Sequence, residues 1–235
     1  METLSGKYAV VTGGTRGIGR AIAERLLQDG AAVAICGRKQ DAVDRAVEKM
    51  QGLGRIVGTA ADVSQLEGAR QLFAAVDEAF GALDILVNNA GQGHFKKVGE
   101  MTPEEWHQNI DLNLNGAFYC AHEALARFAK RGGGFVVNIS SLAARNPFSG
   151  GAAYNASKFG LNGFTEALML DHRNDNVRVS SIMPGSVDTD FSGSGEPAAW
   201  KIAPEDVAEA VSMVLRMPAR TMVSRVEIRP SRPVK

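Results

Sequence analysis

The sequence lacks most of the features of a metal, disulfide or nucleic-acid-binding protein. Its two cysteines, Cys36 and Cys120, lie far apart and form no C-x-x-C motif, so we expect reduced thiols. The four histidines show no metal-binding spacing such as H-E-x-x-H. Lysine plus arginine and aspartate plus glutamate number 26 each. The resulting net charge of zero implies no strongly charged surface for nucleic acid.

Long hydrophobic runs are also missing. No segment reaches the roughly 18 consecutive apolar residues expected of a membrane-spanning helix, and the opening METLSGKYAVVTGG has no apolar run of signal-peptide length. We therefore expect a cytoplasmic protein without membrane contact. The 235 residues, 45% apolar and 22% charged, have the composition of an ordinary globular protein.

Short apolar runs alternate along the chain with longer segments of helical periodicity. This alternation is typical of βαβ units in a parallel, doubly wound sheet. We therefore predict one α/β domain over 1–235 with helices on both faces of the sheet. Strands are expected at 8–14, 31–38, 55–63, 83–91, 132–141, 176–185 and 222–230, and helices at 16–30, 40–51, 65–80, 102–131, 152–172 and 204–216.

A glycine-rich turn, TGGTRGIG (12–19), joins the first expected strand to the first helix. Gly13 allows a tight turn, whereas Gly17 and Gly19 let the backbone approach a ligand and the helix pack on the sheet. The helix start offers free N–H groups and a positive dipole end to a pyrophosphate. The turn is no Walker loop, because no GK[ST] follows, and by itself it is also compatible with a purely structural role.

Polar residues end the third, fourth and fifth expected strands. These are ADV (61–63), NNAG (88–91) and SS (140–141). The carboxyl ends of parallel strands share one edge, where ligands bind at the topological switch point. Asp62 is placed to accept from an adenine amino group or, alternatively, to cap its own loop.

Tyr154 and Lys158 lie one helical turn apart in AAYNASKFG. The unperturbed pKa values of the two side chains are about 10 and 10.4, so neither group is suited to proton transfer at neutral pH. A cationic lysine beside the tyrosine favours tyrosinate, so we expect the pKa of Tyr154 to be lowered. Tyr154 is then a candidate general acid or base, although Y-x-x-x-K alone is a weak signal.

Taken in order, six motifs resemble those of the short-chain dehydrogenase/reductase superfamily in its common Rossmann-type form. They are TGGTRGIG, NNAG, NLNG (113–116), NISS (138–141), YNASK (154–158) and PGSVDT (184–189). The resemblance implies a Rossmann fold with a cofactor half over about 1–135 and a catalytic and substrate part over about 136–235. It also implies an oxidoreductase that interconverts a carbonyl and a secondary alcohol by hydride transfer.

The resemblance further implies a catalytic tetrad of Asn113, Ser141, Tyr154 and Lys158. Tyr154 would transfer the proton, with a bound nicotinamide cation helping to lower its pKa. Lys158 would also hold the nicotinamide ribose, and Ser141 would stabilise the developing alkoxide. Asn113 would anchor a water that relays protons from Lys158.

Two neighbouring residues compete for these roles. Asn115 is an alternative to Asn113, and the family pattern N-L-x-G-x-F favours Asn113. Ser140 is an alternative to Ser141, which the thirteen-residue spacing to Tyr154 favours.

We expect NADP rather than NAD. Folds that bind NAD usually place an acid at the end of the second strand, whereas this sequence has Arg38, which would attract a 2′-phosphate. Arg16 lies where NADP users of the family often have a second basic residue, and Val187 and Thr189 would hold the nicotinamide carboxamide. The expected cofactor-binding residues are Gly13, Thr15, Arg16, Gly17, Ile18, Gly19, Arg38, Asp62, Val63, Asn89, Ala90, Gly91, Tyr154, Lys158, Pro184, Gly185, Val187 and Thr189.

The sequence says less about the substrate. The end MVSRVEIRPSRPVK lacks the "DGG"-like glycines of many 3-oxoacyl thioester reductases of the family, which disfavours that role. DFSGSGEPAAW (190–200) is expected to be a loop over the site. Candidate pocket residues are His94, Arg145, Phe191 and Trp200, with His94 more compatible with a solvated loop. The alternative to an enzyme is a non-catalytic dinucleotide sensor or scaffold.

We also expect a homo-oligomer, a tetramer or a dimer. Related enzymes pair the helices equivalent to 103–130 and 154–172 across subunits. Here both segments have apolar residues on more than one face, which calls for more than one packing partner. These residues include Phe118, Leu125, Phe128, Phe159, Phe164 and Leu168.

Overall fold

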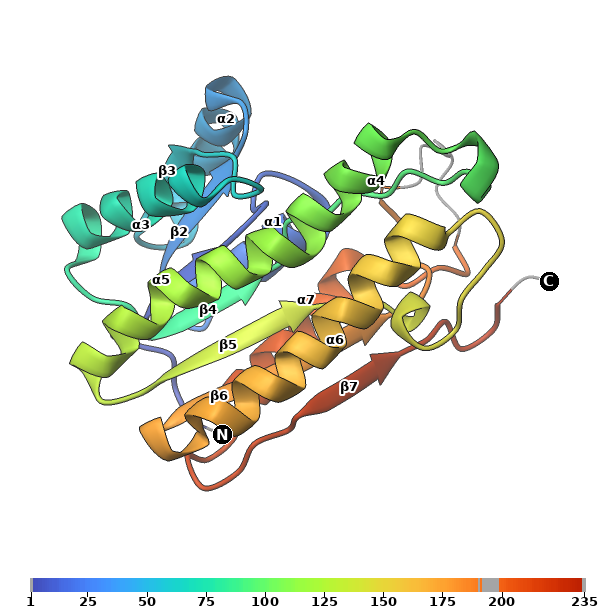
Figure 1. Ribbon diagram of the computed structural model, residues 1–235. Helices are drawn as coiled ribbons and strands as arrows, with labels where there is room; N and C mark the ends of the chain where they lie inside the picture. Colours follow the sequence, from blue (N-terminus) through green and yellow to red (C-terminus); the bar gives the residue numbers. More distant parts are fainter. Residues whose placement is uncertain (1, 190, 192–198, 234–235) are drawn as a thin grey trace.

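A parallel sheet runs through the middle of the molecule in a computed structural model that describes residues 2–189, 191 and 199–233 (Figure 1). The seven strands in these residues have the order β3-β2-β1-β4-β5-β6-β7. They are β1 (Tyr8–Val11), β2 (Ala32–Gly37), β3 (Ile56–Ala60), β4 (Ile85–Asn88), β5 (Gly134–Ile139), β6 (Val177–Pro184) and β7 (Arg225–Ile228). This confirms the predicted α/β fold of Rossmann type.

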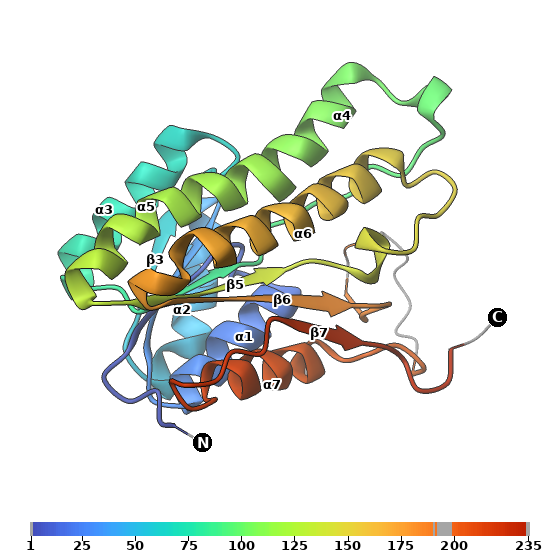
Figure 2. The same cartoon turned by 60° about the horizontal axis from the view of Figure 1, so that its bottom comes forward.

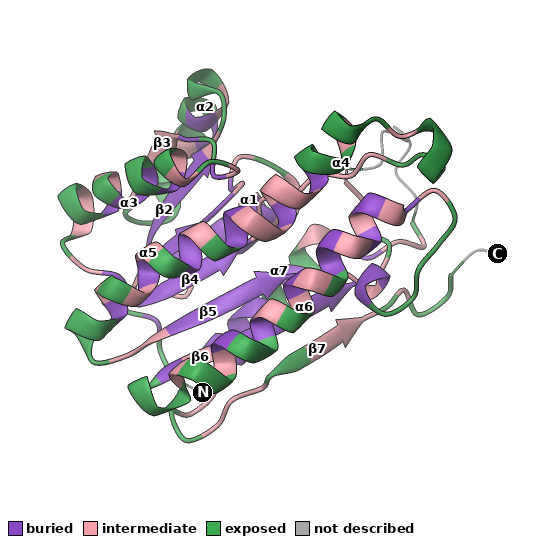
Figure 3. Cartoon of the chain, in the orientation of Figure 1, coloured by how far each residue is buried: buried purple, intermediate pink, exposed green. Residues whose placement is uncertain are grey.

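Helices cover both faces of the sheet (Figure 2). On one face lie α1 (Gly17–Gln28), α2 (Gln40–Met50) and α7 (Pro204–Leu215); on the other lie α3 (Leu66–Phe80), α4 (Pro103–Ile110), α5 (Gly116–Arg131) and α6 (Ala152–His172). Successive strand side chains point to opposite faces, so Ala9 and Val11 join one core and Val10 the other. The inner strands are therefore buried along their length, as Figure 3 shows for β4, β5 and β6.

The strand order reverses its direction at β1, which pairs with β2 on one side and β4 on the other. The loops that follow β1 and β4 therefore diverge to opposite faces and leave a crevice at the carboxyl edge of the sheet. Each strand ends earlier than the sequence predicted. The residues directly after Val11, Ala60, Asn88 and Ile139 are loops, and these loops carry a part of the expected site residues, among them Gly13, Asp62, Asn89 and Ser141.

The expected helix over 102–131 is interrupted. It consists of α4, a π-helical turn at Asp111–Asn115, and α5. Thr102 begins α4 with a capping box, in which its hydroxyl accepts from Glu105 N at 3.2 Å. Such π turns recur at functional sites, and this one contains Asn113.

The apolar residues of α5 and α6 divide between the core and the surface. Phe128 and Leu168 are buried against the sheet, whereas Phe118 and Phe159 are exposed on the outer face. No helix in the described ranges is both long and apolar enough to cross a bilayer.

Candidate active site

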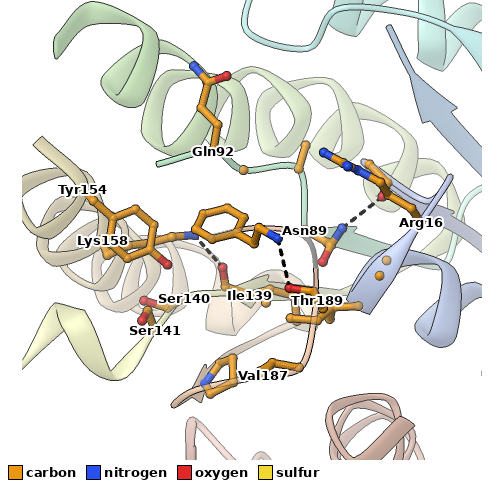
Figure 4. A pocket seen from close by; sticks show the side chains of 18 of the residues that line it. Arg16, Asn89, Gln92, Ile139, Ser140, Ser141, Tyr154, Lys158, Val187 and Thr189 are labelled. Carbon is orange, nitrogen blue, oxygen red and sulfur yellow. Dashed lines mark hydrogen bonds between the residues drawn. The ribbon is translucent and has the colours of Figure 1, made fainter. Parts of the chain in front are cut away.

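A cavity of about 1350 Å³ opens at the carboxyl edge of the sheet. It exceeds the roughly 300–1,000 Å³ of a typical small-ligand pocket, so it has room for a dinucleotide together with a small substrate. All the expected catalytic and cofactor-binding residues except Asn113 line it. Figure 4 shows Tyr154, Lys158 and Ser141 gathered at one end, with Asn89 and Arg16 at the other.

The glycine turn forms the floor of one end of this cavity. Gly13 has φ +65°, and a Cβ there would lie 2.9 Å from Ala90 Cα. A Cβ on Gly19 would lie 2.3 Å from Asn89 Nδ2. No side chain caps the start of α1 and its first turn has no acid. The helix therefore begins with free N–H groups facing a cavity, the arrangement that suits a phosphate.

Thr12 and Asn89 join the ends of β1 and β4. Asn89 Nδ2 donates to Thr12 O at 2.9 Å and to Gly13 O at 3.3 Å. Thr12 Oγ1 accepts from the backbone N–H groups of Asn89 and Ala90, each at 3.0 Å. The sequence analysis missed the role of Thr12, although a polar residue at the end of a buried strand was a signal for it.

Basic side chains gather at the end of β2. Arg16, Arg38 and Lys39 line the cavity with exposed side chains. Neither Arg16 nor Arg38 takes part in an ion pair with another described residue. Asp62 also lines the cavity, and its Oδ1 accepts from Ser64 N at 3.1 Å and Ser64 Oγ at 2.8 Å. Asp62 therefore caps its own loop, the alternative that the sequence left open.

Lys158 is buried beneath the substrate end of the cavity. Its Nζ donates to Ile139 O, at the end of β5, over 2.9 Å. Burial lowers the pKa of Lys158 to about 8. The ammonium thus titrates much closer to neutral pH than a free lysine.

Tyr154 is half-buried, with its ring centroid 5.8 Å from Lys158 Nζ. Burial raises its pKa, and a hydrogen bond with the Ser141 side chain acts in the opposite direction. The expectation that Lys158 lowers the pKa of Tyr154 is therefore wrong for the chain by itself. The physical reason is that Nζ bonds to Ile139 O rather than to the phenol, so desolvation dominates.

Asn113 lies behind Lys158 rather than in the main cavity. Its Nδ2 donates to Ser157 Oγ and Gln92 O, each at 2.9 Å, and its Oδ1 accepts from Gln92 N at 2.9 Å. It shares a second cavity of about 10 Å³ with Lys158. That volume is about the space one water molecule needs. Asn115 instead donates to Asp111 Oδ1 and borders neither cavity.

Both candidate serines line the main cavity. Ser141 Oγ accepts from Ala143 N at 3.1 Å, and the Ser141 side chain lies close enough to Tyr154 to act on the pKa of its phenol. Ser140 is buried, and its Oγ has no hydrogen-bond partner in the described chain. The contact with Tyr154 favours Ser141 as the residue beside the reacting oxygen.

The segment after β6 covers part of the cavity. Pro184, Gly185, Val187 and Thr189 line it, and Val187 forms an isolated bridge with Ile202. In the expected loop at 190–200, residues 190 and 192–198 lie outside the described residues.

The substrate end differs from the expectation in several residues. Of the four candidates, Phe191 and Trp200 line the cavity, whereas His94 and Arg145 do not. The sequence analysis missed Gln92, Phe95, Asn146 and Phe148, which also line it. These residues lie on the loops that follow β4 and β5, and no motif marks them.

Comparisons with known proteins agree with this geometry. A family model described as short chain dehydrogenase matches residues 7–199. The chain belongs to the short-chain dehydrogenase family. It is 40% identical over 223 residues to dehydrogenase/reductase SDR family member 4 of Oryctolagus cuniculus. This alignment covers 94% of this chain and 83% of the relative.

Two solved structures of this family are similar to the whole chain. An alcohol dehydrogenase of Thermococcus sibiricus, complexed with 5-hydroxy-NADP, matches with a TM-score of 0.90 and 32% identity over 97% of this chain and 99% of that one. A 7α-hydroxysteroid dehydrogenase, complexed with NADH and 7-oxo glycochenodeoxycholic acid, matches with a TM-score of 0.90 and 27% identity. The match covers 97% of this chain and 95% of that one. Family membership thus supports a pyridine-nucleotide oxidoreductase of carbonyl and alcohol groups.

The pKa of Lys158 leads to a testable pH dependence of stability. The folded value is about 8, and the unfolded value is about 10.4. Between the two, the unfolded chain binds more protons, so the free energy of unfolding rises with pH. Below about pH 8 the folded state has the full cost of a buried ammonium, and above about pH 10.4 this cost is absent.

We therefore expect the stability difference between wild type and Lys158→Met to move in favour of wild type by about 2 kcal/mol between pH 7 and pH 10. Urea unfolding of both proteins at each pH measures this change. Lys49→Met, which removes an exposed lysine of α2, is the control. A difference that stays constant across this range would contradict the lowered pKa.

Proposed function

We propose that the protein is an NADP(H)-dependent oxidoreductase that interconverts a carbonyl and a secondary alcohol, with Tyr154 as the general acid and base. The observation that carries the proposal is the contact of Tyr154 with Ser141, one helical turn from the buried Lys158, inside a cavity that begins at a glycine turn. When bound, the dinucleotide supplies or accepts the hydride.

The donors around the cavity fit such a cofactor. The uncapped start of α1 and the exposed Arg16 suit phosphate groups. Arg38 suits a 2′-phosphate on the adenosine ribose, because it lines the cavity just after β2 with an exposed side chain, and β2 itself ends in Cys36 and Gly37 rather than in an acid. Val187 and Thr189 suit the carboxamide at the opposite end.

The chain's own residues account for the proton. Tyr154 donates its phenolic proton to the carbonyl oxygen during reduction and takes it back during oxidation. Ser141 donates a hydrogen bond to the same oxygen and stabilises its developing negative charge. Lys158, whose pKa is about 8, restores the proton of Tyr154. Asn113 borders the small cavity together with Lys158 and would anchor there a water that relays the proton from Lys158.

The alternative is a non-catalytic sensor of a dinucleotide. A sensor needs a binding site but no proton donor, whereas here Tyr154 and Lys158 line the cavity together with Ser141, the residues that proton transfer would need. Steady oxidation of NADPH in the presence of a panel of ketones supports the enzyme; binding of NADPH without any turnover supports the sensor.

The protein would act as a homo-oligomer, a tetramer or a dimer. The helices α5 and α6 lie side by side over one face of the sheet (Figure 1). Phe118 and Phe159 are exposed on their outer face, and Phe118 meets the Phe164 ring at a centroid distance of 6.1 Å. A second copy would bury this apolar surface.

The first prediction of this proposal concerns Tyr154. Tyr154→Phe removes only the phenolic proton, so we expect NADPH binding to persist while kcat falls at least about 100-fold. Fluorescence titration with NADPH and steady-state kinetics measure the two effects. Tyr119→Phe, the same change on α5 outside the cavity, is the matched control. More than a tenth of wild-type activity in Tyr154→Phe would show that another group donates the proton.

The second prediction concerns cofactor choice. A charged hydrogen bond contributes roughly 1.5–3 kcal/mol, so Arg38→Asp should lower the selectivity for NADPH over NADH by about 10- to 150-fold. The ratio of kcat/KM for the two cofactors measures it. Arg45→Asp makes the same charge change on α2 without lining the cavity and should leave the ratio unchanged. Equal kcat/KM values in the wild type would contradict the NADP preference.

The third prediction concerns assembly. Light scattering at micromolar concentration should give a mass of at least twice the 25.0 kDa of one chain. Phe118→Asp places a charge in the expected interface and should shift the mass toward a single chain. A wild-type mass near 25 kDa would exclude the oligomer.

A further inference from the structure

Three exposed phenylalanines form a wall beside Tyr154 in the cavity. Phe95, Phe148 and Phe191 come from the loops after β4, β5 and β6, and all three line the cavity. Their exposed fractions are 41%, 47% and 42%. Such a cluster of apolar side chains left open to a cavity is typical of a binding surface rather than of a protein core. We call these three residues the aromatic wall.

The rings of the aromatic wall are arranged around the ring of Tyr154. Phe95 lies 5.6 Å from Tyr154 between centroids, with an interplanar angle of 70°, and Phe191 lies 5.7 Å away at 57°. Phe148 extends the wall from Phe95 at 5.8 Å. These distances are those of edge-to-face aromatic pairs, which are more favourable than apolar area alone explains. A further aromatic ring at this end would meet both ring faces and ring edges.

Most charged side chains on the surface around the aromatic wall take part in ion pairs. Lys96 pairs with Glu105 at 2.5 Å, and Glu227 pairs with both Arg145 and Arg229. Lys201 lies 3.9 Å from Asp188. Among the described residues, the exposed cations without ion pairs that line the cavity are Arg16, Arg38 and Lys39, in the turns after β1 and β2. The buried Lys158, beside Tyr154, donates to Ile139 O.

We propose that the substrate is an uncharged ketone, or the matching alcohol, with an aromatic ring attached directly to the carbonyl carbon, and that Phe95 and Phe148 determine this specificity. The inference rests on the proposed function, because the carbonyl oxygen is taken to bind Tyr154 and Ser141. The ring on the carbonyl carbon then packs against the aromatic wall. An ionised substituent on that ring would be desolvated against the phenylalanine side chains of the wall, which disfavours it.

The test compares three methyl ketones as substrates with NADPH: acetophenone, cyclohexyl methyl ketone and 4-acetylbenzoate. Acetophenone should have a kcat/KM about 2- to 12-fold above that of the cyclohexyl compound, the gain expected of one aromatic contact. The carboxylate compound should fall at least about 10-fold below acetophenone. The inference is overturned if the cyclohexyl or the carboxylate compound equals or exceeds acetophenone.

Variants then assign the preference to the aromatic wall. Phe95→Leu and Phe148→Leu keep an apolar side chain and remove the ring, so each should reduce the ratio of acetophenone to cyclohexyl methyl ketone toward one. Phe80→Leu makes the same change at the end of α3, away from the cavity, and should leave the ratio unchanged. Thermal unfolding verifies that each variant folds. An unchanged ratio in folded Phe95→Leu and Phe148→Leu would overturn the assignment.

The outcomes also separate this inference from the proposed function. Reduction of only the cyclohexyl or carboxylate ketone, lost in Tyr154→Phe, would refute the substrate class and leave the function standing. The absence of turnover with all three ketones and with 1-phenylethanol plus NADP would count against both.

Discussion

The join between Thr12 and Asn89 is the constraint on which the site depends. Where the strand order reverses, β1 and β4 end side by side and their loops diverge, so the last backbone groups of both strands lose their sheet partners. The Asn89 amide and the Thr12 hydroxyl supply replacements at 2.9 to 3.3 Å. These bonds satisfy the backbone groups from within the two loops. No other segment therefore has to enter the crevice to pair with them, and the crevice stays open. The glycine turn, the cations and Tyr154 all border that crevice.

A buried polar network fixes α6, and with it Tyr154 and Lys158, on the sheet. Asn88 Nδ2 donates to Asn138 Oδ1 at 2.9 Å, and Asn138 Nδ2 donates to Thr165 Oγ1 of α6 at 2.8 Å. Apolar packing alone is non-directional, whereas hydrogen bonds in a low-dielectric interior specify one position of the helix. The bond from Lys158 to Ile139 O then holds the ammonium at the end of β5.

The fold was predictable from the sequence because each strand is a continuous apolar run and each helix has a clear period. The residues that line the cavity were predictable where a motif marks them, as at Gly13 or Lys158. The π turn around Asn113 was not, because α4 and α5 have compatible helical patterns on either side of it. Of the aromatic wall, Phe191 was expected in the pocket but Phe95 and Phe148 were not, because the wall joins three loops that only the sheet brings together. The pKa of Tyr154 depends on which group Nζ of Lys158 contacts, and the four-residue spacing of Tyr154 and Lys158 in the sequence does not specify that contact.

The two ends of the cavity differ because they belong to different halves of the sheet. The turns after β1 and β2 carry exposed cations outside the described ion pairs, whereas Lys201 lies near Asp188, and Arg145 and Arg229 share Glu227 near the ends of β6 and β7. The Lys158 ammonium at the end of β5 is buried and donates to Ile139 O. An anion is thus attracted to one end, whereas at the other it would be desolvated against phenylalanine side chains. Arg38 and Phe95 share no contact partner among the described hydrogen bonds, ion pairs and aromatic pairs, so changes at these two sites should have nearly additive effects. Cofactor choice and substrate choice are then separate properties of one crevice.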